Sequence, residues 1–205
     1  NGNSLVLTSV DGNIKVLMGI RDKIRPGVKE DLQRLKKLGV KNLVVLSGDN
    51  QGTVDLVARE LGLTEAHGHM LPEDKSAYIK KLQAQGRIVA FVGDGVNDSP
   101  SIALAQIGIA MGGGTDVAIE TSDVILMNSD FSRLPHALGL TKATARNMRQ
   151  NIIIAVGVVL VLLASVFFSE WMNMSIGMLV HEGSILVVIL NGMRLLRYRL
   201  RASYK

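Results

Sequence analysis

Two aspartates, Asp94 and Asp98, follow an apolar run in the stretch FVGDGVNDSP. Gly93 and Gly95 allow a tight turn between the strand expected before them and the helix expected after them. Carboxylates crowded at the end of a strand are unfavourable unless a cation joins them, and hard oxygen ligands of this kind suit Mg²⁺. The stretch is therefore predicted to bind Mg²⁺ through Asp94 and Asp98, while Asn97 would orient a carboxylate or a phosphoryl oxygen.

A second set of polar residues follows another apolar run. Ser47 offers a hydroxyl and Gly48 a backbone N–H, both suited to phosphoryl oxygens, and Asp49 comes next. Lys75, at a predicted helix start, can place a positive charge on the same phosphoryl group. Taken singly, these residues are typical of an ordinary turn and a solvated lysine. Their order along the chain, on successive strand ends, predicts phosphoryl transfer, where positioning and electrostatics supply most of the catalysis.

Alternating strands and helices must position these residues. In a parallel sheet, ligands lie beyond the carboxyl ends of the strands, and residues 47–50 and 93–98 both fall there. The alternation predicts an α/β fold in which a parallel sheet has helices on both faces. The expected elements are a hairpin over 4–20, helices over 28–38, 53–61, 74–84 and 97–105, and strands over 41–46, 88–92, 107–111 and 124–127.

From residue 131 the pattern becomes helical, and two long apolar runs follow at Asn151–Ser169 and Asn173–Met193. A helix that spans a bilayer needs about 20 mostly apolar residues. Basic residues flank the outer ends of both runs and are absent from the turn between them, so the positive-inside rule predicts a membrane hairpin with both ends in the cytoplasm. The alternative is a buried helical pair of a soluble protein, but Ile152–Phe168 is apolar all round.

Charge and composition narrow the classes of partner. The chain of 205 residues has a net charge of +5 and no cysteine, which excludes disulfides and thiolate metal sites within it. Five basic residues follow Met193, directly after an apolar run, as is typical of the cytoplasmic side of a membrane helix, and no known nucleic-acid reader motif is present. Membrane lipid is therefore the expected partner and nucleic acid is not. The chain begins at Asn1 without a Met, as expected of a fragment.

His181 and Glu182 fall close to the middle of the second apolar run. Ionisable groups at that depth are costly and are candidates for function. An imidazole beside a carboxylate suits Zn²⁺, Co²⁺ or Fe²⁺ better than an alkali ion. Two alternatives remain: a polar pair satisfied by neighbouring helices, and a proton-carrying role for Glu182. The other three histidines, His67, His69 and His136, are expected to be solvated or structural.

Three motifs in this order, SGD, PEDK and GDGVNDSPSIALAQIGIAMG, together resemble the phosphatase-like domain of the P-type ATPases, which belong to the haloacid dehalogenase superfamily. The resemblance implies that Asp94 is a Mg²⁺ ligand, that Asn97 and Asp98 complete its loop, and that Lys75 contacts phosphate. Ser47 stands where the family usually has Thr, and this difference keeps the hydroxyl.

The resemblance also implies a division of the chain. Asp22 and Arg25 resemble the link between the nucleotide-binding and phosphorylation domains. The implied parts are returning strands of the nucleotide-binding domain over 1–24, the phosphorylation domain over 25–130, a connecting helix over 131–150, and two membrane helices with a basic tail over 151–205. The family's nucleophile, an aspartate in an Asp-Lys-Thr-Gly-Thr motif, is absent from the chain. The aspartyl-phosphate is therefore expected to form on an upstream segment.

The stretch MLVHEGSILVVILNGMRLL is similar to the last membrane helix of heavy-metal-transporting P-type ATPases. Its His-Glu-Gly sequence, and the absence of lysine from Ile152–Phe168, favour the cobalt-type subgroup. The implied function is ATP-driven transport of Co²⁺, Zn²⁺ or Fe²⁺ across the plasma membrane, with ATP and Mg²⁺ as cofactors and the phosphorylation domain in the cytoplasm. The alternatives are a zinc/cadmium/lead-type pump, a soluble haloacid dehalogenase-type phosphatase, and a membrane-anchored binding module.

Overall fold

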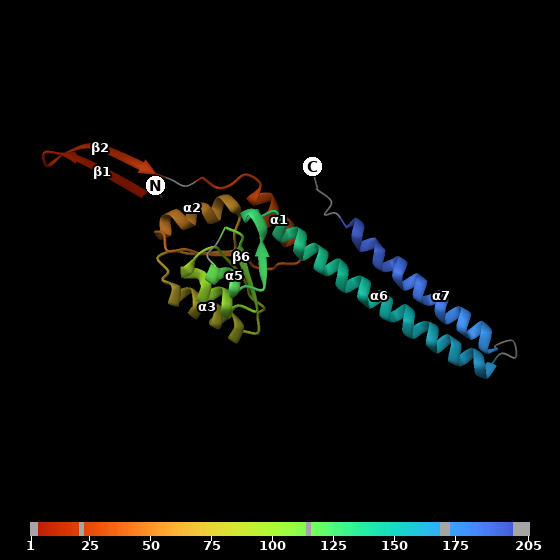
Figure 1. Ribbon diagram of the computed structural model, residues 1–205. Helices are drawn as coiled ribbons and strands as arrows, with labels where there is room; N and C mark the ends of the chain where they lie inside the picture. Colours follow the sequence, from red (N-terminus) through yellow and green to blue (C-terminus); the bar gives the residue numbers. More distant parts are fainter. Residues whose placement is uncertain (1–3, 21–22, 114–115, 169–172, 199–205) are drawn as a thin grey trace. The chain divides into compact units, whose positions relative to one another are not determined.

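The computed structural model describes residues 4–20, 23–113, 116–168 and 173–198. The chain forms two compact units, residues 1–135 and 136–205 (Figure 1). The strands are β1 (Ser4–Val10), β2 (Asn13–Ile20), β3 (Val44–Leu46), β4 (Glu65–His67), β5 (Ala90–Gly93), β6 (Ile107–Met111) and β7 (Val124–Leu126). The helices are α1 (Val28–Lys37), α2 (Gln51–Leu61), α3 (Pro72–Ala84), α4 (Ser99–Leu104), α5 (Asp116–Glu120), α6 (Arg133–Phe168) and α7 (Met174–Met193), with 3₁₀ turns at Val96–Asp98, Met127–Ser129 and Arg194–Arg197.

Parallel strands confirm the predicted α/β fold. β3 pairs with β4, and β6 pairs with β5 on one side and β7 on the other, all in parallel register. Within the described residues these strands form two separate sheets, β3-β4 and β5-β6-β7, instead of one. β3 and β5 therefore each have one edge that pairs with no strand in this part of the chain.

The ends of the helices depend on capping groups. The side chain of Asn50 accepts a hydrogen bond from the Thr53 amide at 2.9 Å, so α2 begins at Gln51, earlier than predicted. The Asp74 carboxylate accepts from the Leu71 amide at 3.0 Å, and α3 begins at Pro72, again earlier than predicted. The helix predicted over 97–105 is instead a 3₁₀ turn followed by the short helix α4.

The described core of the β5-β6-β7 sheet is small. Ile102 of α4, Ala110 of β6 and Ala118 of α5 pack together, and Phe91 of β5 packs against them. Gly108 lies under α4, where an added Cβ would sit 2.5 Å from the Ile102 carbonyl oxygen. The close contact between α4 and the sheet holds the loop before α4 against the end of β5.

The predicted hairpin at the start of the chain is confirmed. β1 and β2 pair in antiparallel register, and the turn between them places Asp11 at φ 50° and Gly12 at φ 79°. A left-handed conformation at two successive residues suits Asp-Gly, as the sequence predicts.

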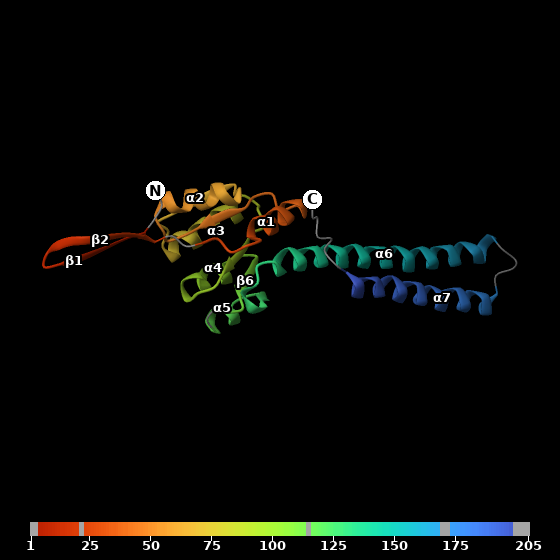
Figure 2. The same cartoon turned by 90° about the horizontal axis from the view of Figure 1, so that it is seen from above.

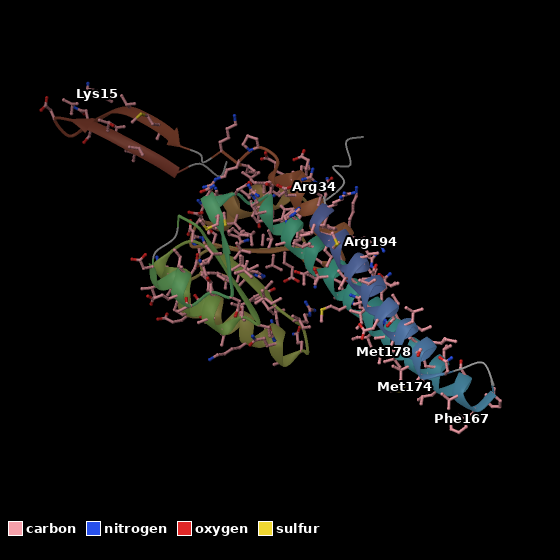
Figure 3. The ribbon with its side chains drawn as sticks, turned by 45° about the vertical axis from the view of Figure 1, so that its right-hand side comes forward. Lys15, Arg34, Phe167, Met174, Met178 and Arg194 are labelled. Atoms are coloured by element: carbon pink, nitrogen blue, oxygen red, sulfur yellow. The ribbon has the colours of Figure 1, made fainter. Side chains whose placement is uncertain are left out.

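In the second unit, α6 and α7 lie side by side and run antiparallel (Figures 1 and 2). Both are long and apolar enough to cross a membrane by length and composition, and no residue of either apolar window is buried. The predicted connecting helix and first span are one continuous helix, α6, from Arg133 to Phe168. The predicted end of that span at Ser169 lies outside the described residues. Phe167 and Met174 lie at the turn end of the hairpin, and Arg194 lies at the other end of α7 (Figure 3).

Candidate phosphoryl-transfer site and membrane hairpin

The loop after β5 folds back over the end of its own strand. The Asp98 amide donates to the Gly95 carbonyl at 3.1 Å, which closes the 3₁₀ turn. The Asp98 side chain then lies directly over Gly93, where an added Cβ would be 2.6 Å from the Asp98 Cβ. Only glycine leaves room for this approach, so Gly93 sets the position of the Asp98 carboxylate.

Lys75 and Asp98 form an ion pair, with 2.8 Å between Lys75 Nζ and Asp98 Oδ1. Their side chains are only 13% and 17% exposed, so water screens the pair weakly. α3 and α4 pack against each other, and the hydroxyls of Ser76 and Ser101 lie 3.3 Å apart between them. The structure thus brings together a lysine and an aspartate that are 23 residues apart in the sequence.

Asp94 and Asn97 are exposed at the end of β5. Within the described residues no three His, Cys, Asp or Glu side chains converge as a metal site would require. Mg²⁺ is commonly held by one or two carboxylates together with waters and substrate phosphate oxygens. Asp94 has the chemistry and the exposure for such a site. Asp98 Oδ1 accepts a hydrogen bond from Lys75. Asp94 and Asp98 therefore fit Mg²⁺ if phosphate and water supply the remaining ligands.

The Ser47–Asp49 turn follows β3. The Ser47 hydroxyl donates to Asp49 Oδ2 at 2.8 Å and accepts from the Asp49 amide at 3.2 Å. Within the described residues the Gly48 amide donates no hydrogen bond, which leaves it available to an anion. In the same part of the chain, no hydrogen bond or ion pair links this turn to the Lys75–Asp98 pair.

The sequence reasoning missed Gln51 and treated His67 and His69 as unremarkable. The segment from Ala66 to Met70 contacts the Ser47–Asp49 turn through backbone hydrogen bonds, and Gln51 bonds to this segment through its side chain. The sequence signal that marks the segment is the glycine between two histidines in AHGHM, which ends two residues before the proline of the next helix.

Tyr78 links α3 to β4. Its hydroxyl donates to Glu65 at 2.6 Å, and its ring lies 4.7 Å from the ring of His67. Burial, together with the hydrogen bond to Glu65, raises the pKa of Tyr78 to about 12. The hydrogen bond from Tyr78, and a weaker one with His67, lower the pKa of Glu65.

The predicted linker and transport residues have the following positions. Asp22 lies outside the described residues, and Arg25 is exposed in the loop before α1. His181 and Glu182 are both exposed on α7. The Ser184 hydroxyl donates to the backbone carbonyl of His181 at 2.6 Å, so this contact does not use the His181 imidazole.

Amide side chains join the middle of α6 to the last turn of α7. Asn147 Nδ2 donates to the Asn191 carbonyl at 2.7 Å, and Asn191 Nδ2 donates to Asn151 Oδ1 at 2.8 Å. Asn151 Nδ2 donates to Asn147 Oδ1 at 3.2 Å, closing the network. Arg194 Nη1 donates to Asn191 Oδ1 at 3.0 Å. Asn147 is buried by these contacts.

Known proteins match this chain in sequence and in structure. A family model described as haloacid dehalogenase-like hydrolase matches residues 2–106. The chain is 39% identical to the zinc-transporting ATPase of Bacillus subtilis over 96% of its own length and 31% of the relative's. It is 38% identical to a probable cadmium-transporting ATPase of Staphylococcus aureus, over 97% of the chain and 27% of the relative.

The solved structures give the same picture. A zinc-transporting PIB-type ATPase in its E2·Pi state matches with a TM-score of 0.83 and 36% identity, over 96% of this chain and 32% of that one. The catalytic domain of the CPx-ATPase CopB-B matches with a TM-score of 0.57 and 30% identity, over 65% of this chain and 57% of that one. This chain spans about a third of the length of the full-length ATPases that it matches. It belongs to the haloacid dehalogenase-like hydrolase family, and its phosphatase-like domain followed by two apolar helices is similar to part of the heavy-metal P-type ATPases.

Proposed function

We propose that the chain is part of an ATP-driven pump that transports a divalent transition metal across a membrane through an aspartyl-phosphate intermediate. The observation that carries the proposal is the ion pair between Lys75 and Asp98, held at the carboxyl end of β5 next to the exposed Asp94. A lysine fixed by a carboxylate beside a second, exposed carboxylate is suited to a phosphoryl group accompanied by Mg²⁺.

In this proposal each residue of the site has a separate task. Lys75 binds a phosphoryl oxygen, and Asp98 holds the lysine in position. Ser47 and Gly48 donate hydrogen bonds to the other phosphoryl oxygens. Asp94, with Asp98 beside it, would hold Mg²⁺, which when bound neutralises charge on the phosphoryl group.

Four further predicted residues have supporting roles. Asp49 accepts a hydrogen bond from the Ser47 hydroxyl at 2.8 Å until a phosphoryl oxygen takes its place. Asn97 orients a phosphoryl oxygen from the exposed loop. Asp22 and Arg25 belong to the link toward the nucleotide-binding domain, so their effect is expected on ATP use and not on metal binding.

The nucleophilic aspartate would come from an upstream segment. The free edges of β3 and β5 support this assignment, because a strand that paired with both edges would join the two parallel sheets into one. Its carboxyl end would meet the ends of β3 and β5, where Ser47 and Asp94 lie. An aspartate at the end of such a strand would therefore face the proposed phosphoryl site.

The transported metal would bind near His181 and Glu182 on α7, with further ligands from other membrane helices. An imidazole and a carboxylate suit Zn²⁺, Co²⁺ and Fe²⁺. The relatives named for zinc and cadmium support Zn²⁺ as the first metal to test, and they support the zinc/cadmium/lead-type pump as the alternative to the cobalt-type one. Both helices would span the plasma membrane and contact lipid, and the phosphatase-like domain would be cytoplasmic.

The test is metal-stimulated ATPase activity of the full-length protein in lipid, with Zn²⁺, Co²⁺, Fe²⁺, Cd²⁺ and Cu⁺, before and after Glu182→Ala. Stimulation by Zn²⁺, Co²⁺ or Fe²⁺ that falls at least tenfold in the variant is expected, because a ligand of the transported ion is lost. Ser184→Ala is the matched control, since it changes the same turn of α7 without removing a ligand. Stimulation that survives Glu182→Ala, or that only Cu⁺ produces, would refute the assignment of the metal site.

A further inference from the structure

The segment from Ala66 to Met70 holds the Ser47–Asp49 turn by its backbone. The Ser47 amide donates to the His67 carbonyl at 2.9 Å, and the Met70 amide donates to the Ser47 carbonyl at 3.0 Å. The His69 amide donates to the Asp49 carbonyl at 2.7 Å. Three backbone groups of the turn are thus fixed from one side, and the direction of the intervening Gly48 amide is fixed with them.

Gln51 fixes the segment in turn. Its Oε1 accepts from the Gly68 amide at 2.6 Å, and its Nε2 donates to the Ala66 carbonyl at 3.1 Å. Nε2 also donates to Asp55 Oδ1 at 2.7 Å, one turn further along α2. This one carboxamide therefore joins the first turn of α2 to the end of β4 and to the segment after it.

Gly68 makes this arrangement possible. A Cβ added there would lie 2.7 Å from the Gln51 Cα and 2.8 Å from the Asp49 carbonyl oxygen, both of them backbone atoms that cannot move aside cheaply. The next residue, His69, has a left-handed conformation with φ 56°, which is uncommon for a residue other than glycine. A close approach and a strained backbone in one short segment indicate that its path is specified by more than the connection of β4 to α3.

We propose that Gln51 is a positioning residue for phosphoryl transfer: through the Ala66–Met70 segment it holds the Ser47 hydroxyl and the Gly48 amide where a phosphoryl oxygen binds. The inference rests on the proposed function of the Ser47–Asp49 turn. To bind a phosphoryl oxygen, the Ser47 hydroxyl has to redirect its proton from Asp49 Oδ2, and a turn whose backbone is held can do this by rotating the side chain alone. The same segment leads directly into α3, which carries Lys75, so Gln51 stabilises the connection between both proposed phosphate contacts.

The experiment compares Gln51→Ala and Gln51→Met with the wild type in the full-length protein in lipid. Phosphoenzyme formed from ³²P-labelled inorganic phosphate, the reverse of hydrolysis, gives the half-saturating phosphate concentration. Both variants are expected to raise it about tenfold, because a contact that is no longer pre-positioned loses about that factor or more. The KM for ATP in ATP hydrolysis is expected to change less than twofold, since the turn contacts the phosphoryl group and not the nucleotide base.

Gln83→Ala is the matched control, because Gln83 also joins two elements through its carboxamide, donating to the Leu104 carbonyl at 2.8 Å, away from the Ser47–Asp49 turn. Its half-saturating phosphate concentration is expected to equal that of the wild type. If Gln51→Met restores the wild-type value while Gln51→Ala does not, Gln51 acts only by packing, and the inference is wrong.

Gly68→Ala gives a second route in case the Gln51 variants unfold, which thermal unfolding would reveal. It displaces the segment and leaves the carboxamide in place, so the same rise in half-saturating phosphate is expected. A folded Gly68→Ala protein with wild-type phosphate dependence overturns the inference alone. A wild-type protein that forms no phosphoenzyme from ATP or phosphate overturns the proposed function and this inference with it.

Discussion

Replacing Lys75 with Met removes the positive charge beside Asp98 and keeps a side chain of similar length. The two partners are 13% and 17% exposed, so Met would leave the Asp98 carboxylate largely buried without a counter-ion. Breaking a fully buried ion pair costs about 3–5 kcal/mol. Because both side chains retain some contact with water, we expect a loss of about 2 kcal/mol in the free energy of unfolding of the first unit, near the value of a hydrogen bond to a charged group.

The loss would be measured by urea unfolding of the full chain in detergent. Proteolysis of the first unit, once it has unfolded, would report the fraction unfolded at each urea concentration. Urea slopes of about 1–2 kcal/mol per M convert 2 kcal/mol into a fall in midpoint of roughly 1–2 M. Lys81→Met is the matched control on the same helix, since Lys81 is exposed, and its change is expected to be below about 0.5 kcal/mol. Equal midpoints for the two variants would refute the reasoning that the Lys75–Asp98 pair stabilises the domain.

Two further predictions concern the same unit. Gly93→Ala is expected to lower the free energy of unfolding by about 1–3 kcal/mol, because the new Cβ would overlap that of Asp98. Gly95→Ala is the control and should cost much less, because the atom nearest to its new Cβ is 4.0 Å away. Equal costs for the two variants would contradict this reasoning. Tyr78→Phe removes a hydrogen bond worth about 1 kcal/mol near neutral pH. Folding raises the pKa of Tyr78 to about 12. The difference in stability between the wild type and Tyr78→Phe should therefore be complete below pH 10 and disappear as the pH rises toward 12. A second loss is expected as the pH falls through the lowered pKa of Glu65. Urea midpoints of both proteins between pH 3 and 12 test this, and an advantage independent of pH would contradict it.

Most of the fold could be predicted because its signals are local. The alternation of apolar strands with helices, the Asp-Gly turn of the hairpin and the two apolar runs each lie within a short window of sequence. The sequence does not predict β4 because its three residues, Glu-Ala-His, are not an apolar run, and it does not predict α5 because five residues are too few for a periodic pattern. The division of the strands into two sheets was also missed, since strand pairing depends on which strands are available.

The site could be predicted less completely. The residue types around Asp94 and Ser47 identify phosphate and Mg²⁺ chemistry, because glycine, hydroxyl and carboxylate occur together after apolar strands. That Lys75 pairs with Asp98 does not follow from sequence, since the contact depends on how α3 and α4 pack. Gln51 was missed for the same reason: its partners Ala66 and Gly68 are 15 and 17 residues away, and a glutamine at a helix start has no distinctive chemistry of its own.

The amide network between α6 and α7 limits the motions that this helix pair can make. The connecting turn restrains the pair at one end, and Asn147, Asn151 and Asn191 bond it together at the other. Sliding α7 along α6 by one helical turn, about 5.4 Å, would break these hydrogen bonds together. The register of the two helices is therefore expected to persist through any conformational cycle, so that α6 and α7 tilt or rotate as one rigid body.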